Sequence, residues 1–386
     1  MNNNDYRDFL DACKTAISQR KDEVLTPHNF ELIASGVFRN KEYVKQVASN
    51  IRNKFINGIV DNLVSFNKNF SSNGGEVFWC VDYNDFLLKL DKILQKDKVK
   101  KVNIFSSYFT NELGINKFFE NDDYTVDSQT DDCVIFHPKF GIVSTGSLVL
   151  NFNSAYDMEL VLNSKTKIFV LPITDFLFKA EESEIFSHLD SIYRSEVDFP
   201  YLTSIYTPSP IDSNEKTYLF LVDNGRSDVL ENKDIRQALT CINCGACKKV
   251  CPVYNIIGDE PYDNVFTGPI ANVILPFIEN TESYKHLCFS CVSCGNCSAV
   301  CPMKIPVAES IVLNKKYFFE NKLMDMKDER ISKSLSKYLL SRKKMNGKQW
   351  MKNIRVKTII NSKIIDGYKF EKSTFNLQYT DNNDGK

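Results

Sequence analysis

The chain has 386 residues, of which 43% are hydrophobic and 25% charged, and its formal net charge is -1. Single hydrophobic cores usually stop growing near ~250 to 300 residues, so this length predicts at least two domains. The composition is that of a globular protein and excludes a wholly disordered chain. The near-zero net charge gives no indication of nucleic acid as a partner.

The first residues, MNNNDYRDFL, have neither the basic start nor the apolar core of a signal peptide. The longest apolar stretch, residues 167–178, contains Pro172 and Asp175, so we expect no transmembrane segment. Twelve cysteines without a secretion signal favour a reducing compartment, where clustered thiols bind metal more often than they form disulfides. We therefore expect a cytoplasmic protein.

Residues 1–72 are predicted to form an N-terminal helical region. Apolar residues recur at intervals of three and four between Tyr43 and Leu63, which indicates one long amphipathic helix. The Ser/Gly-rich stretch at 71–75 ends this helix and marks a domain boundary.

Residues 73–230 are predicted to form an α/β domain, because short apolar runs alternate with helical patterns. We expect strands at 76–81, 102–105, 134–136, 148–150, 167–171 and 217–222, and helices around 87–93 and 176–188. The turn Asp223-Asn224-Gly225 ends the domain.

Two copies of one cysteine motif follow, offset by 50 residues. The spacing C-x2-C-x2-C-x3-C-P is the run that ligates 4Fe-4S clusters, and its fourth cysteine serves the other cluster in two-cluster ferredoxins. We therefore predict two 4Fe-4S clusters with crossed ligands. The first is held by Cys241, Cys244, Cys247 and Cys301, and the second by Cys251, Cys291, Cys294 and Cys297.

Structural zinc is the main alternative, but zinc needs four ligands and has no use for a third cysteine in register followed by Cys-Pro in both halves. Gly245 and Gly295 lack a Cβ, so their backbone can approach the inorganic sulfides closely. A helix start at Gly268-Pro269 lies within the long gap between the two runs. Residues 231–311 are therefore predicted to form a helical two-cluster domain.

The remaining cysteines and histidines are interpreted as structural. Cys288 also forms a Cys-x2-Cys pair with Cys291. The internal repeat matches Cys291 to Cys241, so Cys291 is predicted to be the cluster ligand and Cys288 a spare cysteine that binds no cluster. Cys13, Cys80 and Cys133 are predicted to be small buried hydrophobes. None of His28, His137, His188 and His286 lies in a recognisable catalytic motif.

Residues 312–386 are predicted to form a basic helical extension. Between Val312 and Phe370 there are 16 Lys or Arg and 5 Asp or Glu residues. This charge suits either a solvated helix that covers the cluster domain or an arm that docks an acidic partner or an anionic membrane surface.

The motifs together resemble the lactate-utilisation iron-sulfur subunit family, the LutB type. The resemblance rests on residues 216–310, with the turn at 223–226, the two cysteine runs and Thr267-Gly268-Pro269-Ile270 in the same order. Residues 141–150 resemble the signature of the lactate-utilisation (LUD) domain, whose fold is similar to that of sugar-phosphate isomerases and CoA transferases. The loop Thr145-Gly146-Ser147 within it is either a tight turn or a candidate anion-binding loop.

The resemblance implies an electron-transfer subunit of an L-lactate oxidation complex. Its implied partners are a cysteine-rich reductase-like protein and a second LUD protein. Two other functions stay open: a ferredoxin-like adaptor of a quinone or disulfide reductase, and a LUD-domain enzyme with accessory clusters. Because the sequence contains no dinucleotide-binding G-x-G-x-x-G after a strand, we expect no lactate oxidation by the chain alone.

Overall fold

The computed structural model describes residues 40–120, 124–193, 202–209, 215–262, 266–279 and 281–323. The chain divides into two compact units, residues 1–315 and 316–386. Most of the predicted basic extension, together with Cys13 and His28, lies outside the described residues.

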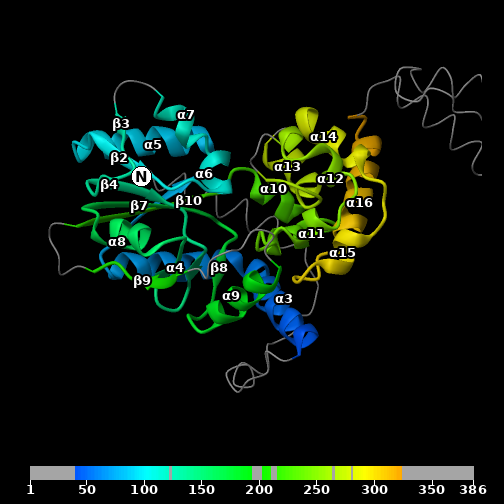
Figure 1. Cartoon of the computed structure of the whole chain (residues 1–386), viewed down its shortest axis with the longest axis horizontal. Helices are drawn as coiled ribbons and strands as arrows, with labels where there is room; N and C mark the ends of the chain where they lie inside the picture. The colour runs from blue at the N-terminus through cyan, green and yellow to red at the C-terminus, as the bar shows by residue number, and fades with distance from the viewer. Residues whose placement is uncertain are drawn as a thin grey trace, which may run out of the picture. The chain divides into compact units, whose positions relative to one another are not determined.

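A six-stranded parallel sheet forms the centre of the α/β domain (Figure 1). Its strands, in spatial order, are β1 (Glu76–Cys80), β10 (Lys216–Val222), β7 (Thr166–Pro172), β4 (Cys133–Phe136), β2 (Lys101–Ile104) and β3 (Thr125–Val126). Every residue of β4 and β7 is buried. Continuous apolar runs of this kind are typical of parallel strands that are covered on both faces.

Three helices cover one face of this sheet: α5 (Tyr83–Lys96), α6 (Tyr108–Glu112) and α7 (Ile115–Phe118). The helix α5 begins where the side chain of Asp82 accepts a hydrogen bond from the Asp85 backbone N–H. Its buried Phe86 packs on Phe220 of β10, with ring centroids 5.0 Å apart. Successive side chains along a strand point to opposite faces of the sheet, so the remaining apolar residues of these strands lie on the other face of the six-stranded sheet.

The opposite face packs against a smaller four-stranded sheet and further helices (Figure 1). The small sheet has the order β8 (Phe176–Leu177), β5 (Phe140–Ile142), β6 (Ser147–Phe152) and β9 (Leu202–Tyr206). The helices of this layer are α3 (Lys41–Asn57), α4 (Ile59–Ser72), α8 (Ala155–Asn163) and α9 (Glu182–Tyr193). Ring pairs join the two sheets: Phe136 with Phe152, and Phe169 with Tyr206, each at 5.2 Å.

Two predicted elements differ from the structure. The single long helix is two helices, α3 and α4, because the backbone at Gly58 leaves helical geometry and its N–H caps α3 through the carbonyls of Lys54 and Phe55. The helix predicted at 176–188 begins only at Glu182. Phe176 and Leu177 form β8 instead, since they pair with Gly141 and Ile142 of β5.

The region after residue 225 is helical, and its described part contains no strand. Its elements are α10 (Arg226–Glu231), η2 (Arg236–Thr240), α11 (Ala246–Lys249), α12 (Tyr254–Ile257), η3 (Glu260–Tyr262), α13 (Ala271–Ile278), α14 (Thr281–Ser290), α15 (Asn296–Val300) and α16 (Val307–Glu320). The predicted helix start at Gly268-Pro269 corresponds to α13. The domain boundaries at residues 72, 230 and 311 stay predictions. Within the described residues, none of the helices has the length and apolarity needed to cross a membrane.

Candidate metal centre

The cysteines of the two runs surround two small cavities in the helical region. One cavity is lined by Cys241, Cys244, Cys247 and Cys301. The other is lined by Cys251, Cys291, Cys294 and Cys297. The fold thus brings three cysteines of each run together with the last cysteine of the other run.

The two runs share one backbone conformation, which explains how each set of thiols forms. Gly245 and Gly295 have left-handed φ values of 74° and 80° and start the short helices α11 and α15. Asn243 and Ser293, which lie two residues before these glycines, also have left-handed φ values. Their N–H groups point back to sulfur, at 3.3 Å from Cys241 Sγ and at 3.4 Å from Cys291 Sγ. This local turn places three thiols on one side of the chain.

Burial makes several of these thiols costly to ionise without a cation. It raises the pKa of Cys241 well above its ordinary value and that of Cys247 to about 12. It also raises the pKa of both Cys297 and Cys301 to about 11. Cysteine binds metal as a thiolate. The positive charge of a bound metal group would therefore offset the cost of a buried thiolate charge.

The donor sets fit a cluster better than a single ion. In the described part of the chain, no three His, Cys, Asp or Glu side chains lie close enough together to hold one metal ion. The four sulfurs of each set instead line a cavity with apolar neighbours, such as Ile270, Met303 and Ile305 around the first. Four cysteine thiolates arranged in this way would hold one 4Fe-4S cluster, which would supply one-electron exchange.

Cys288 lies outside both cavities. Its side chain is fully buried, and its thiol donates a hydrogen bond to the carbonyl oxygen of Asn272 at 2.9 Å. Asn314 lies on the same side, with its Nδ2 3.9 Å from the sulfur. These contacts give Cys288 the role of a packed core residue.

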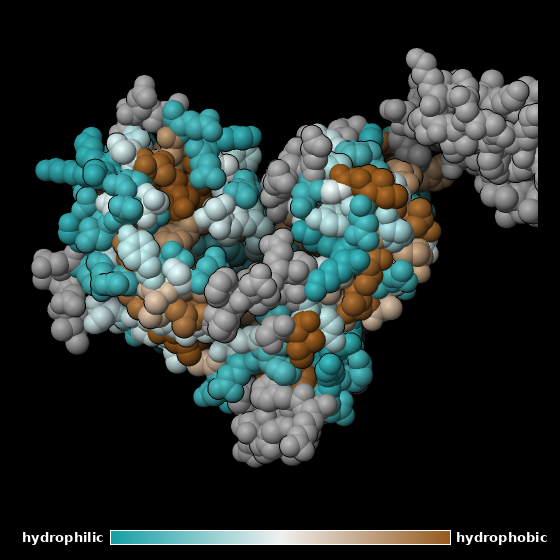
Figure 2. All heavy atoms as spheres, in the orientation of Figure 1, coloured by the Kyte–Doolittle hydropathy of each residue, from teal (hydrophilic) through white to brown (hydrophobic). Residues whose placement is uncertain are grey.

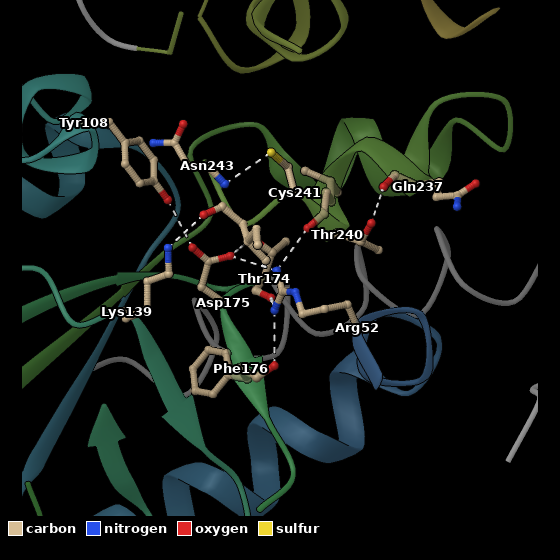
Figure 3. A network of polar contacts seen from close by, with 12 residues as sticks. Arg52, Tyr108, Lys139, Thr174, Asp175, Phe176, Gln237, Thr240, Cys241 and Asn243 are labelled. Atoms are coloured by element: carbon tan, nitrogen blue, oxygen red, sulfur yellow. Dashed lines mark hydrogen bonds and ion pairs between the residues drawn. The ribbon is translucent and has the colours of Figure 1, made fainter. Parts of the chain in front are cut away.

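Two cations of the α/β domain hold the loop that begins the first cysteine run, as Figure 3 shows. Arg52 of α3 is fully buried and donates to the Leu239 carbonyl at 3.1 Å and to Asp175 Oδ1 at 3.0 Å. Lys139 donates to the Ile242 carbonyl at 2.8 Å. Neither contact is predicted from the sequence, although for Arg52 a cation between Ile51 and Phe55 on the apolar face of α3 is a usable signal.

The turn at residues 223–226 joins the two domains. Arg226 is buried and forms a two-pronged ion pair with Glu112 of α6, at 2.7 and 2.9 Å. Asn224 donates to the same carboxylate at 2.9 Å. A Cβ on Gly225 would lie 2.8 Å from the Phe277 carbonyl oxygen, so only glycine permits this approach to α13.

The loop Thr145-Gly146-Ser147 is packed against the end of α4. The Gly146 N–H donates to the Ile142 carbonyl at 2.9 Å, and a Cβ there would lie 2.3 Å from the Phe70 backbone nitrogen. The Ser147 hydroxyl is paired with that of Thr207 at 2.7 Å. These contacts favour the tight turn, and the anion-binding role of the loop stays a prediction.

The other predicted residues are placed as follows. Cys80 and Cys133 are buried in the α/β core, and burial raises the pKa of both thiols. His286 lies exposed on α14 and does not line either cysteine cavity. The ring of His137, directly after β4, packs against the rings of Tyr108 and Phe109 of α6, at centroid distances of 5.1 and 5.3 Å.

Comparison with known proteins defines the class. Residues 237–305 match the family described as 4Fe-4S dicluster domain. The chain is thus an iron-sulfur protein in which a parallel-sheet α/β domain precedes a helical dicluster region.

The particular relatives are proteins named for lactate utilization, which confirms the resemblance predicted from the motifs. The chain is 27% identical over 307 residues to Lactate utilization protein B 1 of Bacillus mycoides (strain KBAB4), covering 73% of this chain and 63% of that protein. It is 33% identical over 187 residues to Lactate utilization protein B of Bacillus thuringiensis (strain Al Hakam), covering 47% and 39%. The chain therefore spans less than two thirds of the length of these relatives.

A solved structure also matches, the crystal structure of a DUF162 family protein from Deinococcus radiodurans. The match has 13% sequence identity and a TM-score of 0.32, and it covers 43% of this chain and 98% of that one. A TM-score of this size does not establish a common fold.

Proposed function

We propose that the chain is the iron-sulfur electron-transfer subunit of an L-lactate oxidation system, and that it relays single electrons through two 4Fe-4S clusters. The first cluster is assigned to Cys241, Cys244, Cys247 and Cys301, and the second to Cys251, Cys291, Cys294 and Cys297. The observation that carries the proposal is that each of these sets lines one cavity. The names of the relatives supply the link to lactate.

Each cluster would contribute one-electron exchange, and the chain's own residues position it. Arg52 and Lys139 tie the first cysteine loop to the α/β domain. The second site lies nearer the surface, since Cys294 is exposed and Val292 is 64% exposed. Figure 2 shows apolar side chains on the visible face of the helical region. A partner that exchanges electrons with the second cluster would meet the chain at Cys294 and Val292.

The partners we propose are a cysteine-rich reductase-like protein and a second LUD protein. The reducing cytoplasm suits this assignment because free thiols are available there for cluster assembly. The proposal requires that the native complex contain such subunits, which affinity purification followed by mass spectrometry would identify.

Metal analysis tests the cluster count. Anaerobically reconstituted protein should carry about eight iron and eight sulfide per chain, as two cubanes require. Stepwise reduction followed by electron paramagnetic resonance should give two one-electron signals. An iron content near four, or stoichiometric zinc, would contradict the two-cluster assignment.

A further inference from the structure

Lys139, in the connection between β4 and β5, reaches the first cysteine run (Figure 3). Its Nζ donates a hydrogen bond to the Ile242 carbonyl oxygen at 2.8 Å. That carbonyl belongs to the same planar peptide group as the N–H of Asn243. The Asn243 N–H in turn donates to Cys241 Sγ at 3.3 Å. A single peptide group therefore connects the ammonium group of Lys139 with the sulfur of a proposed cluster ligand.

Two hydrogen bonds that share a peptide group strengthen each other. A cation at the carbonyl oxygen draws electron density from the peptide nitrogen, which makes the N–H a better donor. Hydrogen bonds to the cysteine sulfurs are among the factors that set the reduction potential of an iron-sulfur cluster. Reduction adds a negative charge, so a stronger N–H···S bond favours the reduced form and raises the potential.

Lys139 also acts on the first cysteine set through its charge. Burial raises the pKa of the Cys244 thiol, while the charge of Lys139 lowers this pKa and that of Asp190 on α9 raises it. The two charges form a pair, with Lys139 Nζ 3.7 Å from Asp190 Oδ2. Because the two charges have opposite signs, removing one or the other should shift the reduction potential at this site in opposite directions.

The second cysteine run also has a lysine, but this lysine bonds to a different peptide group. Lys315 of α16 donates to the Cys291 carbonyl oxygen at 3.2 Å. The N–H that donates to Cys291 Sγ, at 3.4 Å, is that of Ser293 and belongs to the next peptide group along the chain. Lys315 therefore contacts the second run without the shared peptide group that connects Lys139 to sulfur.

A cavity of about 500 Å³ at the carboxyl ends of β2 and β4 gives water access to Lys139. Both Lys139 and Asn243 line this cavity. The Lys139 side chain is nevertheless only 18% exposed, so water and salt screen its charge in part. The effect of this charge on a neighbouring site is therefore largest at low ionic strength.

From the shared peptide group and the charge pair we propose that Lys139 is a positioning residue that raises the reduction potential of the first cluster. It acts through the peptide group between Ile242 and Asn243 and through its own positive charge. The inference rests on the proposed assignment of two clusters. Its consequence for the relay is that an electron is held more favourably on the first cluster, beside the α/β domain, than the cysteines alone would allow.

Redox titration of the anaerobically reconstituted full-length chain, followed by electron paramagnetic resonance at low ionic strength, tests the proposal. Cys291→Ala removes the signal of the second cluster and so identifies that of the first. Lys139→Gln should lower the potential of the first cluster by at least a tenfold change in its reduction equilibrium, which is about 59 mV for one electron. Lys139→Arg, which keeps the charge, should recover at least half of this shift. Asp190→Asn should raise the potential instead.

Lys315→Gln is the matched control, because it removes a lysine that bonds a carbonyl of the other run. It should leave the potential of the first cluster as in the wild type. The proposal is overturned if Lys139→Gln shifts this potential by less than half the stated amount, if Lys139→Gln and Asp190→Asn shift it in the same direction, or if Lys315→Gln shifts it as far.

Iron and sulfide analysis of each variant keeps the outcomes apart. Where Lys139→Gln fails to retain the first cluster, the direction of the shift in Asp190→Asn decides, and a fall or no change overturns the proposal. A wild-type chain that assembles fewer than two clusters would contradict the proposed function itself. Two intact clusters whose potentials ignore Lys139 would contradict only the present inference.

Discussion

Cys288 and Cys291 lie three positions apart in the chain, yet their sulfurs meet different surroundings. The Cys291 sulfur lines a cavity with three other cysteines, whereas that of Cys288 is hydrogen-bonded to Asn272 in the core. The repeat of the motif predicted this difference from spacing alone. At the scale of the residue, the role of a cysteine follows from what its sulfur contacts.

The two cysteines make a matched pair for mutagenesis. Cys291→Ala should lower the iron content by about half, or more if the site collapses, and remove one paramagnetic signal, because one ligand of the second cluster is lost. Cys288→Ala should retain both signals and cost about 1 kcal/mol of stability, the range of a small buried truncation. Loss of a signal in Cys288→Ala alone would show that the ligand register is wrong.

His137 should make the protein less stable in mild acid. Its imidazole has a pKa of about 3 in the folded chain, against 6.5 in the ordinary case, because it is buried. Below pH 6.5 the unfolded chain binds a proton that the folded chain does not bind. The free energy of unfolding should therefore fall as the pH drops below 6.5, by up to about 1.4 kcal/mol per pH unit from this group.

Urea unfolding of the wild type and of His137→Gln between pH 7.5 and 5.5 measures this contribution. The variant should lose stability less steeply below pH 6.5 than the wild type. His286→Gln, at an exposed position on α14, is the control for the loss of a histidine side chain. Identical slopes for the wild type and His137→Gln would refute the assignment.

At the scale of the element, local patterns located most of the α/β domain. The predicted strands lie within a few residues of β1, β2, β4, β6, β7 and β10. The single helix predicted through Gly58 was wrong because the backbone at this glycine leaves helical geometry despite the continuing apolar periodicity. The helix predicted from Phe176 was wrong because this residue pairs with Gly141, far away in the sequence, as part of a strand. Pairing partners far along the chain leave no mark on the local spacing of apolar residues.

A substitution at Gly225 tests the contact between the turn at residues 223–226 and α13, which the spacing of apolar residues does not reveal. Its φ of 77° is left-handed, and a Cβ would lie 2.9 Å from Ile278 Cα of α13. Gly225→Ala should therefore cost more than the ~1 to 2 kcal/mol of left-handed backbone strain alone. Gly114, with a φ of 63° and no atom near a Cβ, is the matched control and should show the strain alone.

Chemical denaturation of both variants gives the comparison. We expect a larger loss of stability for Gly225→Ala than for Gly114→Ala, since only the former must also displace the backbone of α13. Equal losses would mean that α13 does not pack tightly on this turn.

At the scale of the whole molecule, the proposed relay assigns the two-electron oxidation itself to a partner. Removing two electrons from a 2-hydroxy acid normally needs a hydride acceptor such as a flavin or nicotinamide, beside a positioned base. A 4Fe-4S cluster exchanges one electron at a time.

The purified, reconstituted chain should therefore not reduce a dye in the presence of lactate. Adding the purified partner subunits should restore lactate-dependent reduction, and Cys291→Ala should abolish that restored activity. Lactate-dependent dye reduction by the chain alone, at a rate that persists through rigorous purification, would make the α/β domain the catalyst and contradict the relay.

The amino-acid sequence by itself determined the nature of the cofactor and the alternation of strands and helices. Both depend on spacing within about a dozen residues, such as C-x2-C-x2-C and the periods of two and 3.6. Only the tertiary structure decided that Arg52 and Lys139 hold the first cysteine loop, and that Asn243 closes a cavity at the ends of β2 and β4. These contacts join residues that lie more than a hundred positions apart, and their geometry depends on the order of the strands in the sheet, which local periodicity does not encode.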